Sequence, residues 1–330
     1  MATYWRRRAG NDAGSMSGAQ FTIAAHDHVA VVTEVGATLR SFSVAGAPVI
    51  DGFGATAMCE AGRGQVLAPW PNRLADGAYS FGGIEGKAPL DEPERSCAIH
   101  GLVRWLPWSL VRLEPASVQL ACVLHPQPAY PFRLALTITY AVGKSGLAVT
   151  IDAQNSGAGP LPLGVGFHPY LTVAATGADQ GRAPGLPAPP DAIDDWELHL
   201  PGAVALTVDA RGLPTGRTTV ARGPLDYTVA RRIGGTVLDT AFTGLARGAN
   251  GIAQASLCDP VHGRQVTLWV DQSFSYLMCF TGDTLASDAR RRAVAIEPMT
   301  CPPNALATGE SLIRLAPGEA WSARWGISAS

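Results

Sequence analysis

A single carboxylate follows a short apolar run near the end of the chain, in Val294-Ala295-Ile296-Glu297-Pro298. Val294 and Ile296 fit a buried strand. We expect Glu297 to stand where that strand ends, because Pro298 fixes φ and removes a backbone donor. Partial burial raises the pKa of a carboxyl group toward the range that suits a general base. The simpler alternative is a structural ion pair between Glu297 and an arginine, since such pairs also perturb pKa values.

Two histidines stand at the ends of apolar runs, each beside residues that break regular structure. His100 precedes Gly101, and His168 lies in the segment Gly166-Phe167-His168-Pro169-Tyr170. Imidazole donates or accepts a proton near neutral pH, so either side chain suits proton transfer. A single histidine of this kind is more often a hydrogen-bonded structural residue. Two in similar settings, together with Glu297, indicate acid–base chemistry.

Two further polar residues are suited to bind a polar ligand. Arg73 ends the segment Pro71-Asn72-Arg73, and its guanidinium offers five donors in one plane to hydroxyl groups, ring oxygens or carboxylates. The alternative is a turn in which Arg73 pairs with Asp76. Asp239 lies within an apolar run, where a buried carboxylate needs a partner. It is alternatively a turn residue after Gly234-Gly235.

The elements that must position these residues are strands. Side chains alternate between apolar and polar with a period of two, which indicates antiparallel sheets with one buried face. The apolar positions that show this pattern most clearly are Val118, Leu120, Cys122 and Leu124; Leu134, Leu136, Ile138 and Tyr140; Leu147, Val149 and Ile151; and Val266, Leu268 and Val270. Shorter strands are expected over 21–25, 29–35 and 38–44. No amphipathic helix longer than two turns is expected, and no βαβ rhythm or fixed-period repeat is present.

The organisation predicted from this pattern is one all-β domain, a large antiparallel β-sandwich over residues 19–330. Residues 1–18 are expected to form a disordered tail. Two stretches, 85–97 and 174–195, are polar or rich in Gly and Pro and are expected to be surface loops rather than domain linkers. Strand patterning of the same kind lies on both sides of each loop.

Composition excludes several classes of function. Of 330 residues, 47% are hydrophobic and 16% charged, and the formal net charge is −2, which gives no electrostatic reason to expect nucleic acid or an anionic membrane as a partner. No apolar run approaches the roughly 18 residues of a membrane span. The six cysteines form no C-x-x-C pair, and three (Cys122, Cys258, Cys279) lie in strand-like runs. Reduced thiols in a cytoplasmic protein are therefore expected, and a zinc site is not.

Five segments, taken in order, resemble the successive motifs of the aldose 1-epimerases, or galactose mutarotases, of the bacterial branch. They are Pro71-Asn72-Arg73, His100-Gly101-Leu102, Gly166-Phe167-His168-Pro169-Tyr170, Asp239-Thr240-Ala241-Phe242 and Glu297-Pro298-Met299-Thr300. They span nearly the whole chain after the first residues. The resemblance implies a galactose mutarotase-like supersandwich, a sugar pocket on one concave sheet, and no cofactor.

The resemblance also implies a role for each matching residue. Glu297 matches the general base and His168 the general acid, while His100 matches a histidine that holds the sugar near its ring oxygen. Arg73, Asn72 and Asp239 match substrate-binding segments. A metal site built from His100, His168, Asp239 and Glu297 is conceivable by ligand type, but none is expected because the family works without metal. One departure is Met278, which aligns where the family often carries a substrate-contacting glutamine.

The expected function is the interconversion of α- and β-anomers of a free aldose such as glucose or galactose. An acid and a base, from distant parts of the sequence, must act on opposite sides of one acetal carbon. Two alternatives remain: a hexose-6-phosphate 1-epimerase, for which Arg104 or Arg63 are candidate phosphate ligands, and a non-catalytic carbohydrate-binding module. The small-molecule sugar is the only partner expected, with the chain a monomer or homodimer. Which sugar is preferred cannot be inferred from the sequence.

Overall fold

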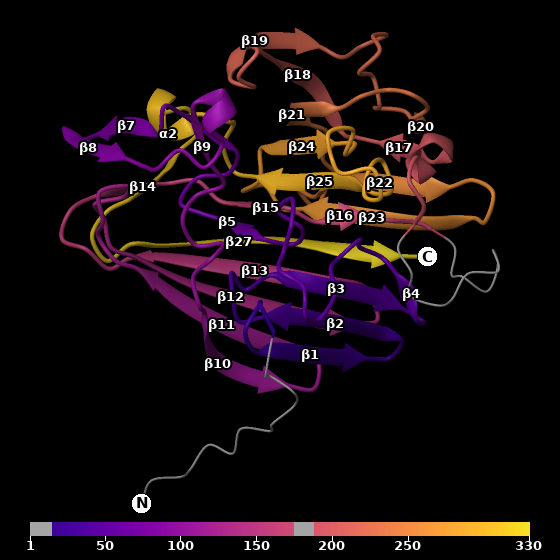
Figure 1. Ribbon diagram of the computed structural model, residues 1–330, viewed down its shortest axis with the longest axis horizontal. Coiled ribbons are helices and arrows are strands. Elements are labelled where there is room, and N and C mark those ends of the chain that lie inside the picture. Colours follow the sequence, from indigo (N-terminus) through magenta and orange to yellow (C-terminus); the bar gives the residue numbers. More distant parts are fainter. Residues whose placement is uncertain (1–14, 175–187) are drawn as a thin grey trace, which may run out of the picture.

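Two large antiparallel sheets form the body of the protein, which we describe from a computed structural model of residues 15–174 and 188–330 (Figure 1). The first sheet has nine strands. In spatial order they are β10 (Ser109–Glu114), β11 (Ser117–Leu124), β12 (Leu134–Gly143), β13 (Gly146–Asn155), β27 (Ala320–Ala329), β23 (Arg264–Val270), β22 (Ala253–Asp259), β17 (Glu197–His199) and β20 (Arg231–Arg232). The predicted all-β class and antiparallel pairing are confirmed.

The second large sheet has eight strands and contains most of the predicted site. In spatial order they are β19 (Pro214–Thr219), β18 (Gly202–Val208), β21 (Asp239–Leu245), β24 (Tyr276–Phe280), β25 (Val294–Met299), β15 (Gly166–Phe167) and β5 (Val66–Leu67), and β16 (Tyr170–Leu171) also pairs with β25. Because β15 and β16 share one edge of β25, the chain between them is brought beside Glu297.

Smaller sheets and short helices complete the described fold. A four-stranded sheet consists of β1 (Gln20–Ala25), β2 (His28–Thr33), β3 (Leu39–Val44) and β4 (Ala47–Pro48). Three two-stranded ribbons are β6 (Arg73–Ala75) with β9 (Cys97–Ile99), β7 (Ala78–Phe81) with β8 (Ile84–Lys87), and β14 (Leu161–Leu163) with β26 (Ile313–Leu315). The helical turns are η1 (Pro93–Arg95), η2 (Ala192–Asp195) and α2 (Ala305–Thr308). In Figure 1, β1–β3 lie beside β10–β13, and α2 lies with the β7–β8 ribbon.

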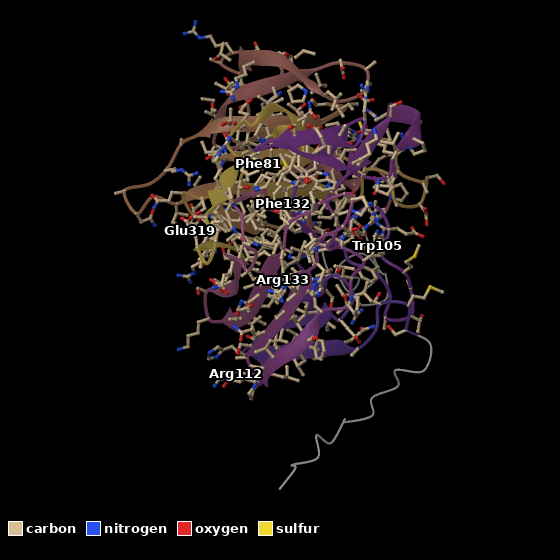
Figure 2. All side chains as sticks on the ribbon, turned by 90° about the vertical axis from the view of Figure 1, so that its left-hand side faces the viewer. Phe81, Trp105, Arg112, Phe132, Arg133 and Glu319 are labelled. Atoms are coloured by element: carbon tan, nitrogen blue, oxygen red, sulfur yellow. The ribbon has the colours of Figure 1, made fainter. Side chains whose placement is uncertain are left out.

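The core forms between the inner faces of the sheets, where the predicted alternation places apolar side chains. In β12, every second residue from Leu134 to Val142 is buried, and β11 follows the same pattern. Phe81 of the β7–β8 ribbon packs edge-to-face on Phe132, with ring centroids 5.8 Å apart (Figure 2). Burying each such side chain contributes about 1.5–3 kcal/mol. The alternating strands therefore supply much of the free energy that holds the two sheets together.

Strands β24 and β25 are buried on both faces, which explains how a carboxylate can be surrounded by protein. Leu277, Cys279 and Ile296 point into the main hydrophobic core. Met278 and Glu297 alternate with them and face the opposite side of the sheet, where they line a cavity. The apolar run seen in the sequence is thus a central strand with two covered faces.

Several expectations need correction. Pro298 does not end the strand, because β25 continues to Met299. The backbone N–H groups of Ile296 and Thr300 donate to the carbonyls of Pro169 and Val165. Residue 298 lies between them on the same edge of β25 and faces the gap between β15 and β16. No backbone donor is required there, so proline is tolerated.

The stretch 85–97 is not wholly a loop, because β8 covers residues 84–87 and η1 covers 93–95. Most of the predicted loop at 174–195 lies outside the described residues.

Residues 1–14 of the predicted tail also lie outside the described residues. The last residues of that tail are ordered instead, because Ser15 and Ser17 donate hydrogen bonds to the carbonyls of Ala55 and Ala57. Within the described ranges the longest α-helix has four residues, and no helix there is long and apolar enough to cross a membrane.

Candidate active site

Glu297 presents a buried carboxyl group from the middle of the eight-stranded sheet. Its side chain is 3% exposed, and its Oε2 atom has no hydrogen-bond partner among the described residues. Burial raises the pKa of Glu297 well above its ordinary value, and the nearby negative charge of Asp239 raises it further, against a smaller opposing effect of Arg73. Burial therefore favours the protonated form of this carboxyl group.

His168 stands in the gap between β15 and β16 and touches Glu297. Its Nε2 atom lies 3.3 Å from Oε1 of Glu297. The backbone of His168 is fixed on both sides, because its N–H donates to Gln65 and its carbonyl accepts from Gly64. The ring stacks on Tyr170 with centroids 5.1 Å apart, and the Tyr170 hydroxyl donates to the carbonyl of Ala61. This packing fixes the imidazole toward the carboxyl group.

Burial shifts the pKa values of His168 and Glu297 in opposite directions. Burial lowers the pKa of His168 to about 3 and raises that of Glu297, so burial favours the uncharged form of each group. Nε2 of His168 and Oε1 of Glu297 are 3.3 Å apart, close enough for a proton to pass from the carboxyl group to the imidazole. Transfer of that proton gives an imidazolium and a carboxylate without any change in net charge. The geometry thus lets one proton serve two groups.

His100 approaches the same place from the β6–β9 ribbon. Its ring centroid lies 5.2 Å from that of His168, in an edge-to-face arrangement. The backbone N–H of Asn72 donates to its Nδ1 atom at 3.2 Å. Burial and the charges of its neighbours lower the pKa of His100 well below the ordinary value, so the ring is neutral and carries its proton on Nε2. An N–H donor is therefore available for a ligand oxygen.

Arg73 is held by two carboxylates, neither of which is the predicted alternative Asp76. Its Nε and Nη2 atoms donate to the two oxygens of Glu92 at 2.7 and 2.9 Å, and its Nη1 lies 4.0 Å from Oδ2 of Asp239. Asp76 pairs instead with Arg211. Asp239 begins β21 and is not a turn residue. The side-chain oxygen of Asn72 accepts a hydrogen bond from the backbone N–H of Arg73, and Asn72 has φ of 56°. Asn72 therefore shapes the backbone just before β6.

A cavity of about 530 Å³ joins these residues. All six predicted site residues line it, as does Met278. Trp105, labelled in Figure 2, also lines the cavity and has 46% of its area exposed. Two other hollows, of about 640 and 550 Å³, contain none of the predicted residues. The structure therefore brings together side chains that are separated by more than 200 positions in the sequence.

Some lining residues were not singled out from the sequence. Glu92 and Asp91 lie in the polar stretch that was assigned to a surface loop, and they bind Arg73 and Arg104. A charged, Pro-containing stretch close to Arg73 was the available signal, but nothing in its spacing specifies a partner. Arg63 pairs with Asp51. Among the described residues, no cluster of three or more His, Cys, Asp or Glu side chains is arranged to hold a metal ion.

Known structures define the class to which this fold belongs. An aldose epimerase homologue from Caenorhabditis elegans superposes with a TM-score of 0.80 at 16% identity, covering 94% of this chain and 98% of that one. A galactose mutarotase-like protein from Clostridium acetobutylicum gives 0.79 at 18% identity, covering 94% of each chain. The sandwich is thus a galactose mutarotase-like fold, as expected.

The sequence places the chain within a family. Residues 19–328 match the aldose 1-epimerase family model, and the chain belongs to the aldose 1-epimerase family, whose members are isomerases. The uncharacterized protein YihR of Escherichia coli K12 is 34% identical over 304 residues, which cover 92% of this chain and 91% of YihR.

Proposed function

We propose that this protein is an aldose 1-epimerase that interconverts the α- and β-anomers of a free aldose, with Glu297 and His168 as its acid–base pair. The observation that carries the proposal is the 3.3 Å contact between His168 Nε2 and Glu297 Oε1 in a cavity of about 530 Å³. The hydroxyl oxygen at C1 and the ring oxygen of an aldose bond to the same carbon. An acid and a base that act on them must therefore lie close together, as these two groups do.

The reaction needs two proton transfers and one bond cleavage. The carboxylate of Glu297 removes the proton of the C1 hydroxyl, and the imidazolium of His168 protonates the ring oxygen as the bond from C1 to that oxygen breaks. The open-chain aldehyde rotates about the C1–C2 bond, and the reverse steps close the ring on the other face. Each positioned group contributes about 10²–10⁴-fold to the rate. No electrons enter or leave, so no redox partner is needed.

The effect of burial on Glu297 and His168 is consistent with this cycle. After ring opening, Glu297 carries the proton and His168 is neutral, which are the forms toward which burial shifts the two groups. The active ionic form has the same number of protons and differs only by transfer across the contact. Burial of the pair therefore favours the state that accompanies the open-chain intermediate.

The charges around the cavity favour an uncharged sugar over a phosphorylated one. Each arginine that lines it is partnered: Arg73 and Arg95 by Glu92, and Arg104 by Asp91. Glu94 and Asp239 add further negative charge to the lining. Among the described residues the cavity thus has no surplus of positive charge for a phosphate group. The Nε2–H of His100 and the Nη1 of Arg73 are suited to neutral hydroxyl and ring oxygens.

Polarimetry of freshly dissolved α-D-glucose and α-D-galactose tests the proposal. We expect the purified protein to accelerate the decay of optical rotation, and a hexose 6-phosphate at equal concentration to compete weakly. Strong competition by the phosphate, with little acceleration of either free sugar, would favour the hexose-6-phosphate alternative. Sugar binding measured by calorimetry without any acceleration would instead establish a binding module.

A further inference from the structure

The turn between β18 and β19 reaches from the eight-stranded sheet that carries Glu297 (the catalytic sheet) to the β6–β9 ribbon. This ribbon carries Arg73 on one strand and leads into His100 on the other. Strand β18 pairs with β21 in a register that runs it toward the Asp239 end of that strand. The turn then extends over residues 209–213, closed by the side chain of Asp209, which accepts hydrogen bonds from the N–H groups of Arg211 and Leu213.

Arg211 joins this turn to both strands of the ribbon at its open end. Its Nε donates to the carbonyl of Arg95 at 2.8 Å. Its Nη2 donates to the carbonyl of Ser96 at 2.6 Å and to Oδ1 of Asp76 at 2.8 Å. Asp76 follows β6, whereas Arg95 and Ser96 precede β9. A single guanidinium therefore holds both chain segments, with the planar fork geometry that only arginine offers.

The residue next to Arg211 lies directly against the substrate-binding arginine. Gly212 has φ of 76°, and a Cβ atom at this position would stand 2.6 Å from Nη1 of Arg73 and 3.0 Å from Nη1 of Arg95. Only a residue without a side chain fits in this left-handed conformation at this distance. The backbone of the turn thus forms one wall around the Arg73 guanidinium, with Glu92 and Asp239 on its other sides.

A two-stranded ribbon needs such support. Isolated pairs of strands are marginally stable in water, and β6 and β9 pair through only three residues each. On the other edge, Asn304 accepts from the N–H of Ala75 and donates to the carbonyl of Arg73. Those contacts tie β6 alone. Arg211 also binds the segment that leads into β9, through the carbonyls of Arg95 and Ser96.

We infer that Arg211 is a positioning residue, which fixes the β6–β9 ribbon against the catalytic sheet and thereby sets the place of Arg73 in the sugar cavity. The inference rests on the proposed function only for its kinetic consequence. Glu297 lies on β25 and His168 lies between β15 and β16, so neither belongs to the ribbon, and loss of Arg211 should weaken sugar binding much more than it slows the chemical step.

Kinetics of Arg211→Ala test the inference, with Arg217→Ala as the matched control. Arg217 is an exposed arginine on the same hairpin that pairs with Glu310. We expect Arg211→Ala to raise KM about tenfold, the scale of a charge-assisted hydrogen bond, with kcat little changed, and Arg211→Lys to restore it only in part. The control should keep the wild-type KM. A wild-type KM in Arg211→Ala, or an equal rise in the control, would overturn the inference.

A double-mutant cycle and hydrogen exchange separate positioning from general stability. If Arg211 acts through Arg73, its removal should add little to KM in an Arg73→Ala background; fully additive effects would contradict this. Amide hydrogen exchange over residues 72–76 and 95–100 should become faster in Arg211→Ala and not in Arg217→Ala. Hydrogen exchange does not depend on enzymatic activity, so it tests the positioning role of Arg211 even if the wild type is inactive with sugars. Unchanged exchange in Arg211→Ala would overturn that role, and faster exchange would support it.

Discussion

Met278 of β24 lies directly opposite Glu297 of β25, so a thioether flanks the buried carboxyl group. Methionine offers no hydrogen-bond donor to an ionised carboxylate. The Oε2 atom of Glu297 accordingly has no partner among the described residues. This neighbour favours the protonated carboxyl group, in keeping with the raised pKa of Glu297.

Replacing Met278 by glutamine should lower the pKa of Glu297, because an amide N–H beside Oε2 stabilises the carboxylate. The alkaline limb of the kcat/KM profile should then move to lower pH. Met278→Leu is the control, since it keeps an apolar side chain of similar size. Identical alkaline limbs in the two variants would show that position 278 does not set the ionisation of Glu297.

The pH profile of the wild-type enzyme should be bell-shaped. Activity requires the pair to hold one proton, so kcat/KM should fall in acid as His168 takes a second proton and fall in alkali as Glu297 loses the only one. Burial lowers the pKa of His168 to about 3 and raises that of Glu297 above its ordinary value, which together define a broad plateau. A rate that rises to a plateau and never declines in alkali would indicate a single base acting alone.

The burial of Glu297 should also cost stability above the ordinary pKa of a glutamate. The folded-state pKa is raised, so the contribution of this group is fully present below the unfolded pKa and is lost as pH rises through the folded pKa. Glu297→Gln cannot ionise and should melt at a higher temperature than the wild type at about pH 8, with a smaller difference near pH 4. Thermal unfolding followed by circular dichroism measures this. A difference that does not vary with pH would argue against a buried ionisation.

Gly62 should be required for the placement of His168. A Cβ atom at Gly62 would lie 2.7 Å from Cδ2 of His168, and the residue has φ of 74°. Gly62→Ala should therefore lower kcat and also cost about 1 kcal/mol or more of stability. Gly82→Ala is a matched control, because Gly82 also has positive φ but nothing within 4 Å of the added atom. Equal activity in the two variants would contradict the steric role.

The sequence predicted the strands well because burial imposes a period of two. Val118 to Leu124 and Leu134 to Tyr140 alternate as expected, since one face of each strand packs in the core. Pro298 was read as a strand end because proline cannot donate. Pro298 lies opposite the gap between β15 and β16, and this position depends on how those two strands pair with β25. A local sequence pattern does not predict such long-range pairing.

The site residues were predicted from ordered motifs, whereas their contacts could not be. Arg73 binds Glu92 rather than Asp76, and Arg211 takes Asp76 across 135 positions. Such long-range pairs between charged side chains leave no periodic signal. The contact of His168 with Glu297 likewise depends on a sheet that joins two distant segments. The two groups lie 3.3 Å apart in the structure, whereas the reaction places them on opposite sides of one carbon.

Polarimetry of Glu297→Gln tests most directly whether Glu297 accepts the proton of the C1 hydroxyl group. The variant should retain the wild-type circular dichroism spectrum and lose about 10²–10⁴-fold in the rate of mutarotation of whichever free aldose the wild type converts. Glutamine keeps the shape of the side chain but cannot take up the proton. Near wild-type turnover in the folded variant would contradict the account.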